Sequence, residues 1–261
     1  MGKVIALTNQ KGGVAKTTTA VNLGTGLAQE GNKVLLIDGD PQGSLTICMG
    51  YKDPDKLETT ITDILTRVVN DEDIPTGFGI LKCSENVDLI PSNIELSAME
   101  LTLANVMSTE LMLRSYVESI RDEYDYIIAD CMPSLGLMTV NILACADTVL
   151  IPVQAAYLPV KGLQALIKTI YTVKRRLNQK LEIEGILLTM VDKRTNYAKE
   201  IIDEVNEVYG KSISVFPTEI PLSVRAAETS AMGCNIYDYD PKGKAAIAYK
   251  ELTKEVIAHG C

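Results

Sequence analysis

The chain contains no tryptophan, only two phenylalanines and a single histidine among its 261 residues. Because aromatic rings are so few, the core must be built mainly from aliphatic side chains. Hydrophobic residues make up 46% of the sequence, which is enough for a sizeable core in a chain of this length. The lone histidine, His259, excludes metal or acid–base sites that need several imidazole groups.

The six cysteines form no C-x-x-C pair and no spacing typical of metal ligands. Scattered cysteines of this kind are typical of reduced thiols inside the cell. The first residues run directly into an apolar segment without a charged leader, and no apolar run approaches the roughly 18 residues of a membrane span. We therefore expect a cytoplasmic protein that does not bind membranes.

The formal net charge is −9 and the estimated pI is about 4.8. A net negative charge of this size argues against binding of nucleic acid over the surface as a whole. A local basic patch remains compatible with it.

Short apolar runs alternate along the chain with helical patterns, and each run is apolar on both faces, as in a buried parallel strand. We expect strands at Val4–Leu7, Val34–Ile37, Val87–Ile90, Tyr126–Ala129, Thr148–Val153 and Ile186–Met190. We expect helices at Thr17–Glu30, Ile94–Val106, Glu110–Arg121, Val160–Leu177, Ala198–Tyr209 and Lys242–Ala258. This alternation predicts an α/β fold, a doubly wound and mostly parallel sheet with helices on both faces.

We expect residues 1–261 to form a single domain, because no linker or repeat interrupts the alternation. The polar, turn-rich segment from Tyr51 to Gly79 is interpreted as an insertion on the surface of that domain.

A glycine-rich stretch, TNQKGGVAKTTTA (Thr8–Ala20), joins the first predicted strand to the first helix. Glycines allow backbone N–H groups to turn toward a phosphate, and a helix N-terminus adds partial positive charge. In such a loop Lys16 neutralises the β- and γ-phosphates and the Thr17 hydroxyl holds Mg²⁺. The strict G-x-x-x-x-G-K-[ST] pattern fails, because Gln10 and Ala15 stand at the two glycine positions.

Two further acidic segments follow strands. Asp38 and Asp40 come directly after the second strand, and Asp130 closes the strand in YDYIIADCMP. Acids at the carboxyl ends of parallel strands lie where α/β proteins bind their ligands. A lone acid that closes a buried strand beside a phosphate loop is typical of a Walker B carboxylate, which contacts Mg²⁺ directly or through water.

At this point the sequence resembles the ParA/MinD family of ATPases. KGGVAKTT is similar to the deviant Walker A motif of that family, DGDPQGSLT to its switch region and YDYIIADCMPSLG to its Walker B strand. VDKRTNYAKEI and IPLSVRAAE resemble its C-terminal segments. The matches run in family order over nearly the whole chain and are most similar to the ParA/Soj branch.

The resemblance implies a site for ATP and Mg²⁺, and it assigns roles by position. Nucleotide contacts fall on Lys11, Gly12, Gly13, Val14, Ala15, Lys16, Thr17 and Thr18, with Met190 and Pro221 near the adenine. The resemblance assigns magnesium binding to Thr17, Asp38 and Asp130. It assigns catalysis to Lys11, Lys16 and Asp40, and Asp40 is the residue that orients the attacking water. In this family the lysine at position 11 reaches the nucleotide of the partner subunit in an ATP-bound homodimer, so that hydrolysis depends on dimerisation.

Two residues depart from the family pattern. Ala15 replaces a glycine, which costs about 1–2 kcal/mol if the backbone there has a positive φ. Met132 replaces the first of two prolines that follow the Walker B acid, which loosens the turn and leaves Asp130 in place. We expect nucleotide binding to survive, and Ala15 to affect hydrolysis or dimerisation.

Arg194 and Arg225 match arginines that carry non-specific DNA contacts in the Soj branch. Lys174, Arg175 and Arg176 form a further basic cluster. Such residues bind phosphates regardless of sequence, although a solvated charged face explains them as well.

The resemblance therefore predicts a partition ATPase that segregates DNA and associates with the nucleoid. ATP binding drives a dimer, the dimer binds DNA, and a ParB-like centromere-binding partner stimulates hydrolysis. The alternative is a MinD-like or adaptor ATPase switch that positions a protein cargo without binding DNA. An electron-transfer ATPase related to the nitrogenase iron protein is disfavoured by the cysteine pattern.

Overall fold

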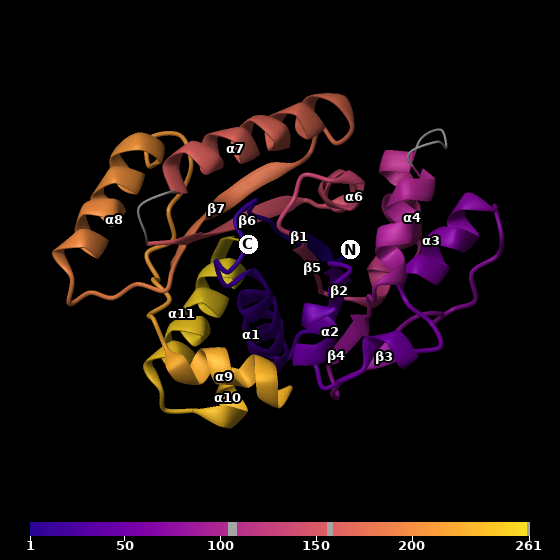
Figure 1. The fold of residues 1–261 in the computed structure, drawn as a ribbon, viewed down its shortest axis with the longest axis horizontal. Helices are drawn as coiled ribbons and strands as arrows, with labels where there is room; N and C mark the ends of the chain where they lie inside the picture. The colour runs from indigo at the N-terminus through magenta and orange to yellow at the C-terminus, as the bar shows by residue number, and fades with distance from the viewer. Residues whose placement is uncertain (104–108, 156–158, 260–261) are drawn as a thin grey trace.

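The structure is a computed structural model, and it describes residues 1–103, 109–155 and 159–259. Its centre is a seven-stranded sheet with the order β3-β4-β2-β5-β1-β6-β7 (Figure 1). The strands are β1 (Lys3–Leu7), β2 (Val34–Gly39), β3 (Leu81–Lys82), β4 (Val87–Ile90), β5 (Tyr126–Cys131), β6 (Thr148–Gln154) and β7 (Glu182–Thr189). All neighbouring pairs are parallel except β3 with β4. The predicted α/β fold and its six predicted strands are confirmed.

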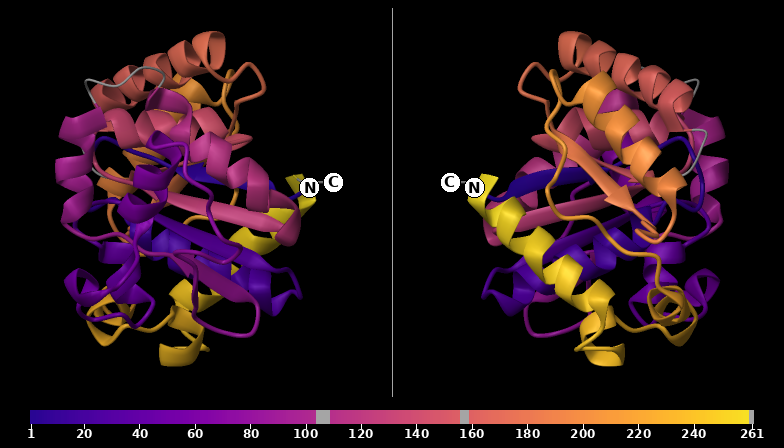
Figure 2. Two further views of the ribbon diagram at one scale, coloured as in Figure 1. Left: turned by 90° about the vertical axis from the view of Figure 1, so that its right-hand side faces the viewer. Right: turned by 90° about the vertical axis from the view of Figure 1, so that its left-hand side faces the viewer.

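Helices cover both faces of this sheet (Figures 1 and 2). They are α1 (Lys16–Gln29), α2 (Ser44–Cys48), α3 (Ile61–Val69), α4 (Glu95–Leu103), α5 (Met112–Ile120), α6 (Leu137–Cys145), α7 (Pro159–Arg176), α8 (Asn196–Tyr209), α9 (Val224–Met232), α10 (Ile236–Tyr239) and α11 (Lys244–His259). The predicted helix Ile94–Val106 corresponds to α4, and its last three residues lie outside the described part of the chain.

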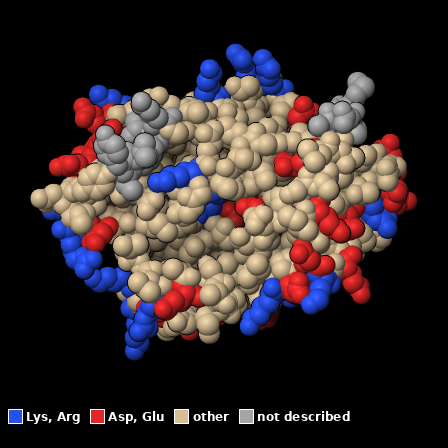
Figure 3. Space-filling view, in the orientation of Figure 1, with Lys and Arg blue, Asp and Glu red and all other residues tan. Residues whose placement is uncertain are grey.

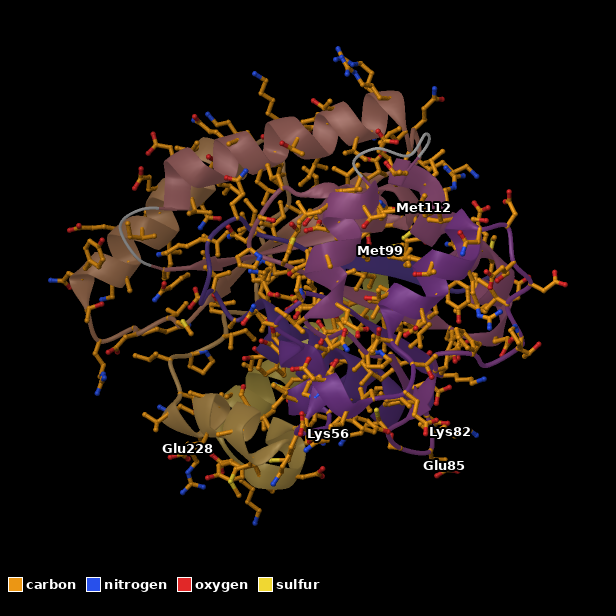
Figure 4. The ribbon with its side chains drawn as sticks, turned by 45° about the vertical axis from the view of Figure 1, so that its right-hand side comes forward. Lys56, Lys82, Glu85, Met99, Met112 and Glu228 are labelled. Atoms are coloured by element: carbon orange, nitrogen blue, oxygen red, sulfur yellow. The ribbon has the colours of Figure 1, made fainter. Side chains whose placement is uncertain are left out.

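The two faces carry separate cores. One core joins the sheet to α3, α4, α5, α6, α7 and α8, and the other joins it to α1, α2, α9, α10 and α11. Met99 of α4 and Met112 of α5, labelled in Figure 4, belong to the first core. The expected aliphatic character holds, since Ile, Leu and Val supply most of the buried side chains.

The segment from Tyr51 to Gly79 is more than a surface insertion, because it contains α3. Ile61, Ile64 and Leu65 of this helix are fully buried against the sheet layer. The helix begins with a capping box, in which the Thr60 hydroxyl accepts from the Thr62 N–H and Asp63 accepts from the Thr60 N–H. Polar residues on both sides of this short helix hide it from a search for long periodic patterns.

The register of the parallel strands positions the site. Leu7 of β1 and Asp38 of β2 both stand beside Asp130 of β5. The loops that follow these three strands therefore meet at one edge of the sheet, where α/β proteins bind ligands.

Candidate nucleotide-binding site

A cavity of about 390 Å³ opens at this edge. Its lining comes from several parts of the chain: the loop and helix start between Gly12 and Thr18, Asp40 with Ser44 after β2, Pro133 after β5, Met190 with residues 220–230, and Tyr249 of α11. In the same orientation as Figure 1, Figure 3 shows a hollow near the middle of the face, where basic and acidic atoms lie next to each other. The structure thus brings together residues that are more than 170 positions apart in the sequence.

The floor of the cavity is the turn between β1 and α1. A Cβ atom added at Gly12 or Gly13 would meet no heavy atom within 4 Å, so the backbone there faces open space. Gly13 has a φ of 70°, and Ala15 adopts a left-handed conformation with φ 64° and ψ 30° at the N-cap of α1. The backbone therefore has the form of a phosphate cradle, and Ala15 has the positive φ at which an alanine is strained.

Lys16 lies in the cavity wall and is only 7% exposed. Its Nζ donates to the Lys11 carbonyl oxygen over 3.3 Å. Burial lowers the pKa of this ammonium group, while the nearby Asp130 carboxyl raises it. A half-satisfied ammonium group beside open space is suited to an anionic ligand.

Thr17 and Asp130 form a pair next to the cradle. The Thr17 hydroxyl donates to one carboxyl oxygen of Asp130 over 2.6 Å, and the other oxygen is buried without a hydrogen-bond partner. Burial raises the pKa of Asp130 to about 8, although the bond from Thr17 opposes the shift. A buried free carboxyl oxygen beside a hydroxyl is the kind of donor set that Mg²⁺ prefers, so these two residues fit the ion.

Asp38 is fully buried and already has three donors. Its carboxyl group accepts from the Thr46 N–H and hydroxyl over 2.8 and 2.7 Å, and from the Asp40 N–H over 3.2 Å. Burial nevertheless raises its pKa to about 7. These bonds fix the turn that carries Asp40 to the cavity, and the place of Asp38 in the magnesium shell stays a prediction.

Lys11 is exposed and does not line the cavity. Its Nζ donates to the Gln154 side chain over 3.3 Å, and its N–H donates to Asn9. Val14 is buried beneath the loop, so its contribution to binding would come from its backbone. The reach of Lys11 into a partner subunit stays a prediction.

Met190 and Pro221 both line the cavity. Val191 pairs with Pro221 in a parallel bridge, and the Leu222 N–H donates to the Val191 carbonyl over 3.1 Å. Met190 itself has a φ of 53°, a conformation that only turns and strained sites adopt for such a residue. The contact of both residues with an adenine stays a prediction.

Hydrogen bonds that the sequence analysis missed hold the loop and the start of α1 in place. Asn9 donates to the Pro152 carbonyl over 2.7 Å, and Thr189 donates to the Val14 carbonyl over 3.0 Å. Thr19 of α1 pairs with the hydroxyl of Tyr249 on α11 over 3.2 Å. Asn9 adjoins the glycine-rich motif and could have been suspected, whereas Thr189 and Tyr249 reach the loop only through the tertiary fold.

The two predicted DNA-binding arginines lie on the surface outside the cavity. The Arg194 guanidinium makes a two-point contact with Asp192 over 2.8 and 2.7 Å, and its side chain is 87% exposed. Arg225 pairs with Asp240 over 3.3 Å. Arg194 lines a neighbouring cavity that shares Pro221 and Leu222 with the nucleotide cavity, so the two surfaces are continuous.

Within the described residues, five cysteines are free, and no cluster of His, Cys, Asp and Glu is arranged to hold a metal by itself. None of the helices described here is both long enough and apolar enough to span a bilayer.

Comparison with known proteins agrees with this geometry. The AAA domain family matches residues 2–183. The chain is 46% identical to the sporulation initiation inhibitor protein Soj of Bacillus subtilis over the full length of both proteins. It is 41% identical to the chromosome partitioning protein ParA of Myxococcus xanthus, covering 98% of this chain and 88% of that one.

Solved structures extend the likeness. Cobyrinic acid a,c-diamide synthase from Mycobacterium smegmatis, bound to an ATP analogue and magnesium, superposes with a TM-score of 0.86 at 33% identity, covering 100% of this chain and 96% of that one. A plasmid partition protein of Borrelia burgdorferi bound to AMPPNP gives 0.78 at 27% identity, covering 99% of each. From its fold, its phosphate cradle and these relatives, the chain belongs to the Soj/ParA family of chromosome-partitioning ATPases.

Proposed function

We propose that this chain is an ATP-dependent DNA partition ATPase of the cytoplasm that associates with the nucleoid. ATP binds in the cavity at the carboxyl end of β1, and the ATP-bound chain forms a homodimer that binds DNA without sequence preference. A ParB-like centromere-binding protein stimulates hydrolysis and returns the chain to its unbound state.

The observation that carries this proposal is the arrangement around Asp130. A free buried carboxyl oxygen, the Thr17 hydroxyl and the Lys16 ammonium group surround an open glycine cradle. Nothing in the packing of the core requires this combination, because each buried polar group costs free energy unless it is paired. A triphosphate with its magnesium ion supplies the missing partners.

Within this site the side chains have distinct tasks. Gly12 and Gly13 leave room for the phosphates, and Lys16 neutralises the charge that develops on them. Thr17 and Asp130 hold the magnesium ion, which neutralises charge on the phosphate oxygens when it is bound. Asp40 lines the cavity on a turn fixed by Asp38, where it can orient a water molecule for attack on the terminal phosphate.

The exposure of Lys11 supports a role between subunits. The side chain lies outside the cavity of its own chain, held by a long hydrogen bond to Gln154. A lysine so placed is free to reach the nucleotide of a second copy, which would make hydrolysis depend on dimerisation.

The DNA contacts fall to Arg194 and Arg225, whose exposed side chains are held by carboxylates on the same surface. Phosphates would replace Asp192 and Asp240 as partners, and this exchange predicts binding that weakens steeply with salt.

The test is co-sedimentation of the full chain with a DNA duplex, with ATP and without it, at about 50 and 200 mM salt. We expect ATP-dependent binding that falls by at least about tenfold between the two salt concentrations. The double variant Arg194→Glu, Arg225→Glu should lose this binding. Lys82→Glu, a single charge reversal of the same kind on the exposed edge strand β3, should retain it (Figure 4).

Binding that is absent with ATP, or that does not respond to salt, would contradict DNA partition. If ATP still produces a dimer under those conditions, the MinD-like or adaptor alternative, in which the dimer recruits a protein cargo, would replace it.

A further inference from the structure

The helices α7 and α8 lie next to each other on the molecule (Figures 1 and 2). A groove of about 1140 Å³ lies between them. Its volume exceeds the roughly 300–1,000 Å³ of typical small-molecule sites. It shares no residue with the nucleotide cavity and lies on the face of the sheet opposite α1 and α11. The proposed ATPase function does not use it.

The groove has an apolar base and apolar side chains at its edges. Tyr209 and Ile213 form a buried base, each 6% exposed, while Tyr171 and Val208 stand at the edges with 51% and 46% of their surface exposed. Scattered exposed hydrophobic residues need no explanation, but Tyr171 and Val208 border one groove above a buried apolar base, and an apolar surface of this kind indicates a binding site. Two helices that border such a groove offer the shape that accepts a third helix.

The charges on the groove have one sign. Lys168, Lys174 and Arg175 line it, and no Asp or Glu does, although the whole chain carries a net charge of −9. Lys174 is paired with Glu182, whereas no ion pair is found for Lys168 or Arg175 within the described residues. Basic side chains stand along the top edge of Figure 3, over α7. This charge distribution favours an acidic ligand.

We propose that the groove between α7 and α8 binds an amphipathic helix of a partner protein whose apolar stripe is flanked by acidic residues. The leucine-sized side chains of the stripe cover Tyr171, Val208 and Ile213. The acidic flanks pair with Lys168 and Arg175. Duplex DNA is the weaker candidate, because phosphates use the basic rim and leave the apolar base uncovered.

Fluorescence anisotropy on the full chain tests this directly with three labelled helical peptides. The first carries leucines at i, i+3, i+4 and i+7 with glutamates elsewhere. The second replaces its glutamates by lysines, and the third replaces its leucines by serines. A labelled DNA duplex is the fourth probe.

We expect the first peptide to bind at least about tenfold more tightly than either counterpart. Val208→Asp and Arg175→Glu should each weaken its binding by about tenfold or more. Lys199→Glu, a charge reversal on an α8 residue that does not line the groove, should leave it unchanged. All three positions are exposed, and thermal unfolding checks that each variant is folded.

Equal binding of the glutamate and lysine peptides, or unchanged binding to Val208→Asp, would overturn the proposal. So would the absence of peptide binding. If no peptide binds and Arg175→Glu weakens binding of the DNA duplex, the basic rim of the groove is a binding site for phosphate. Since the peptides need no nucleotide, these outcomes are independent of ATP-dependent DNA binding.

Discussion

The nucleotide cavity and the α7–α8 groove are built in opposite ways. In the cavity the charged groups are buried, the backbone is strained at Ala15 and Met190, and hydrogen bonds from distant strands fix the loop. In the groove the charges of Lys168 and Arg175 are exposed, and the apolar residues except Ile213 belong to two regular helices. The difference separates a surface prepared for one ligand from a surface that fits any helix of suitable charge and shape.

The largest effect should come from removing the free oxygen at the cavity. Asp130→Asn keeps the size of the side chain, but an amide cannot both accept from Thr17 and offer a second oxygen to a metal ion. We expect hydrolysis of ATP to fall by about a hundredfold or more. The measurement is phosphate release with the DNA and protein partners present, with Arg175→Ala in the groove as the control. Activity within a few fold of the wild type would mean that Asp130 is a structural acid.

The second prediction concerns buried charge, which the cavity has and the groove lacks. Because burial raises the pKa of Asp38 to about 7, the folded chain keeps a proton that the unfolded chain has lost above its pKa of about 4. The folded state therefore binds more protons between these values, and the free energy of unfolding falls as the pH rises through this window.

Asp38→Asn should remove this contribution, which is at most about 1.4 kcal/mol per pH unit for one proton. The slope of the free energy of unfolding against pH is measured by urea unfolding of the nucleotide-free chain at pH 5, 6 and 7. Each carboxyl group contributes at most about one proton to this slope. Asp130 contributes a slope of the same sign in both proteins, and because the Asp38 carboxyl helps to raise the pKa of Asp130, the difference between the two slopes reports both groups. Identical slopes for the two proteins would show that Asp38 is ionised throughout, held by its three donors.

Backbone strain gives a third, smaller contrast. Ala15→Gly should relieve the left-handed conformation and raise the free energy of unfolding by about 0.5–1 kcal/mol. Gly31 offers a matched control, because it has a φ of 89° with no heavy atom near its missing Cβ. Gly31→Ala should lower stability by about 1 kcal/mol through the backbone alone. If Ala15→Gly is destabilising, the methyl group of Ala15 packs better than its conformation suggests, and ATP hydrolysis by this variant shows whether that packing slows turnover.

The smallest effects should come from exposed charges. Arg194→Ala and Arg175→Ala should each change the free energy of unfolding by less than about 0.5 kcal/mol, because exposed ion pairs contribute little in water. Arg194→Ala should nevertheless weaken DNA binding, and Arg175→Ala should weaken binding of the acidic helix. A large loss of stability in either variant, measured by urea unfolding, would place that arginine in the folding core instead of a binding surface.

Much of this architecture could be predicted from the sequence, because continuous apolar runs specify buried parallel strands. The glycine-rich turn and the acids after β2 and β5 were likewise visible, since residues at the ends of parallel strands must meet. The helix α3 was missed because its nine residues are short and flanked by polar turns, although Thr60 and Asp63 form a recognisable cap.

The bonds that organise the site could not be predicted. No pattern in the sequence indicates that the Asp38 carboxyl group accepts hydrogen bonds from Thr46, or that the Arg194 guanidinium donates to Asp192. The groove could not be predicted either, because its walls come from α7, from the end of α8 and from the residues after α8, which only the tertiary fold brings together.

The hydrogen bond between Thr19 and Tyr249 has a consequence for biosynthesis. Tyr249 lines the nucleotide cavity from α11, and it follows Thr19, which lies just after the glycine loop, by 230 residues. A nascent chain therefore carries its phosphate loop, while the residues between the two are synthesised, without the wall that completes the pocket. Premature capture of ATP by an unfinished chain is disfavoured, and the nucleotide becomes a ligand of the completed protein.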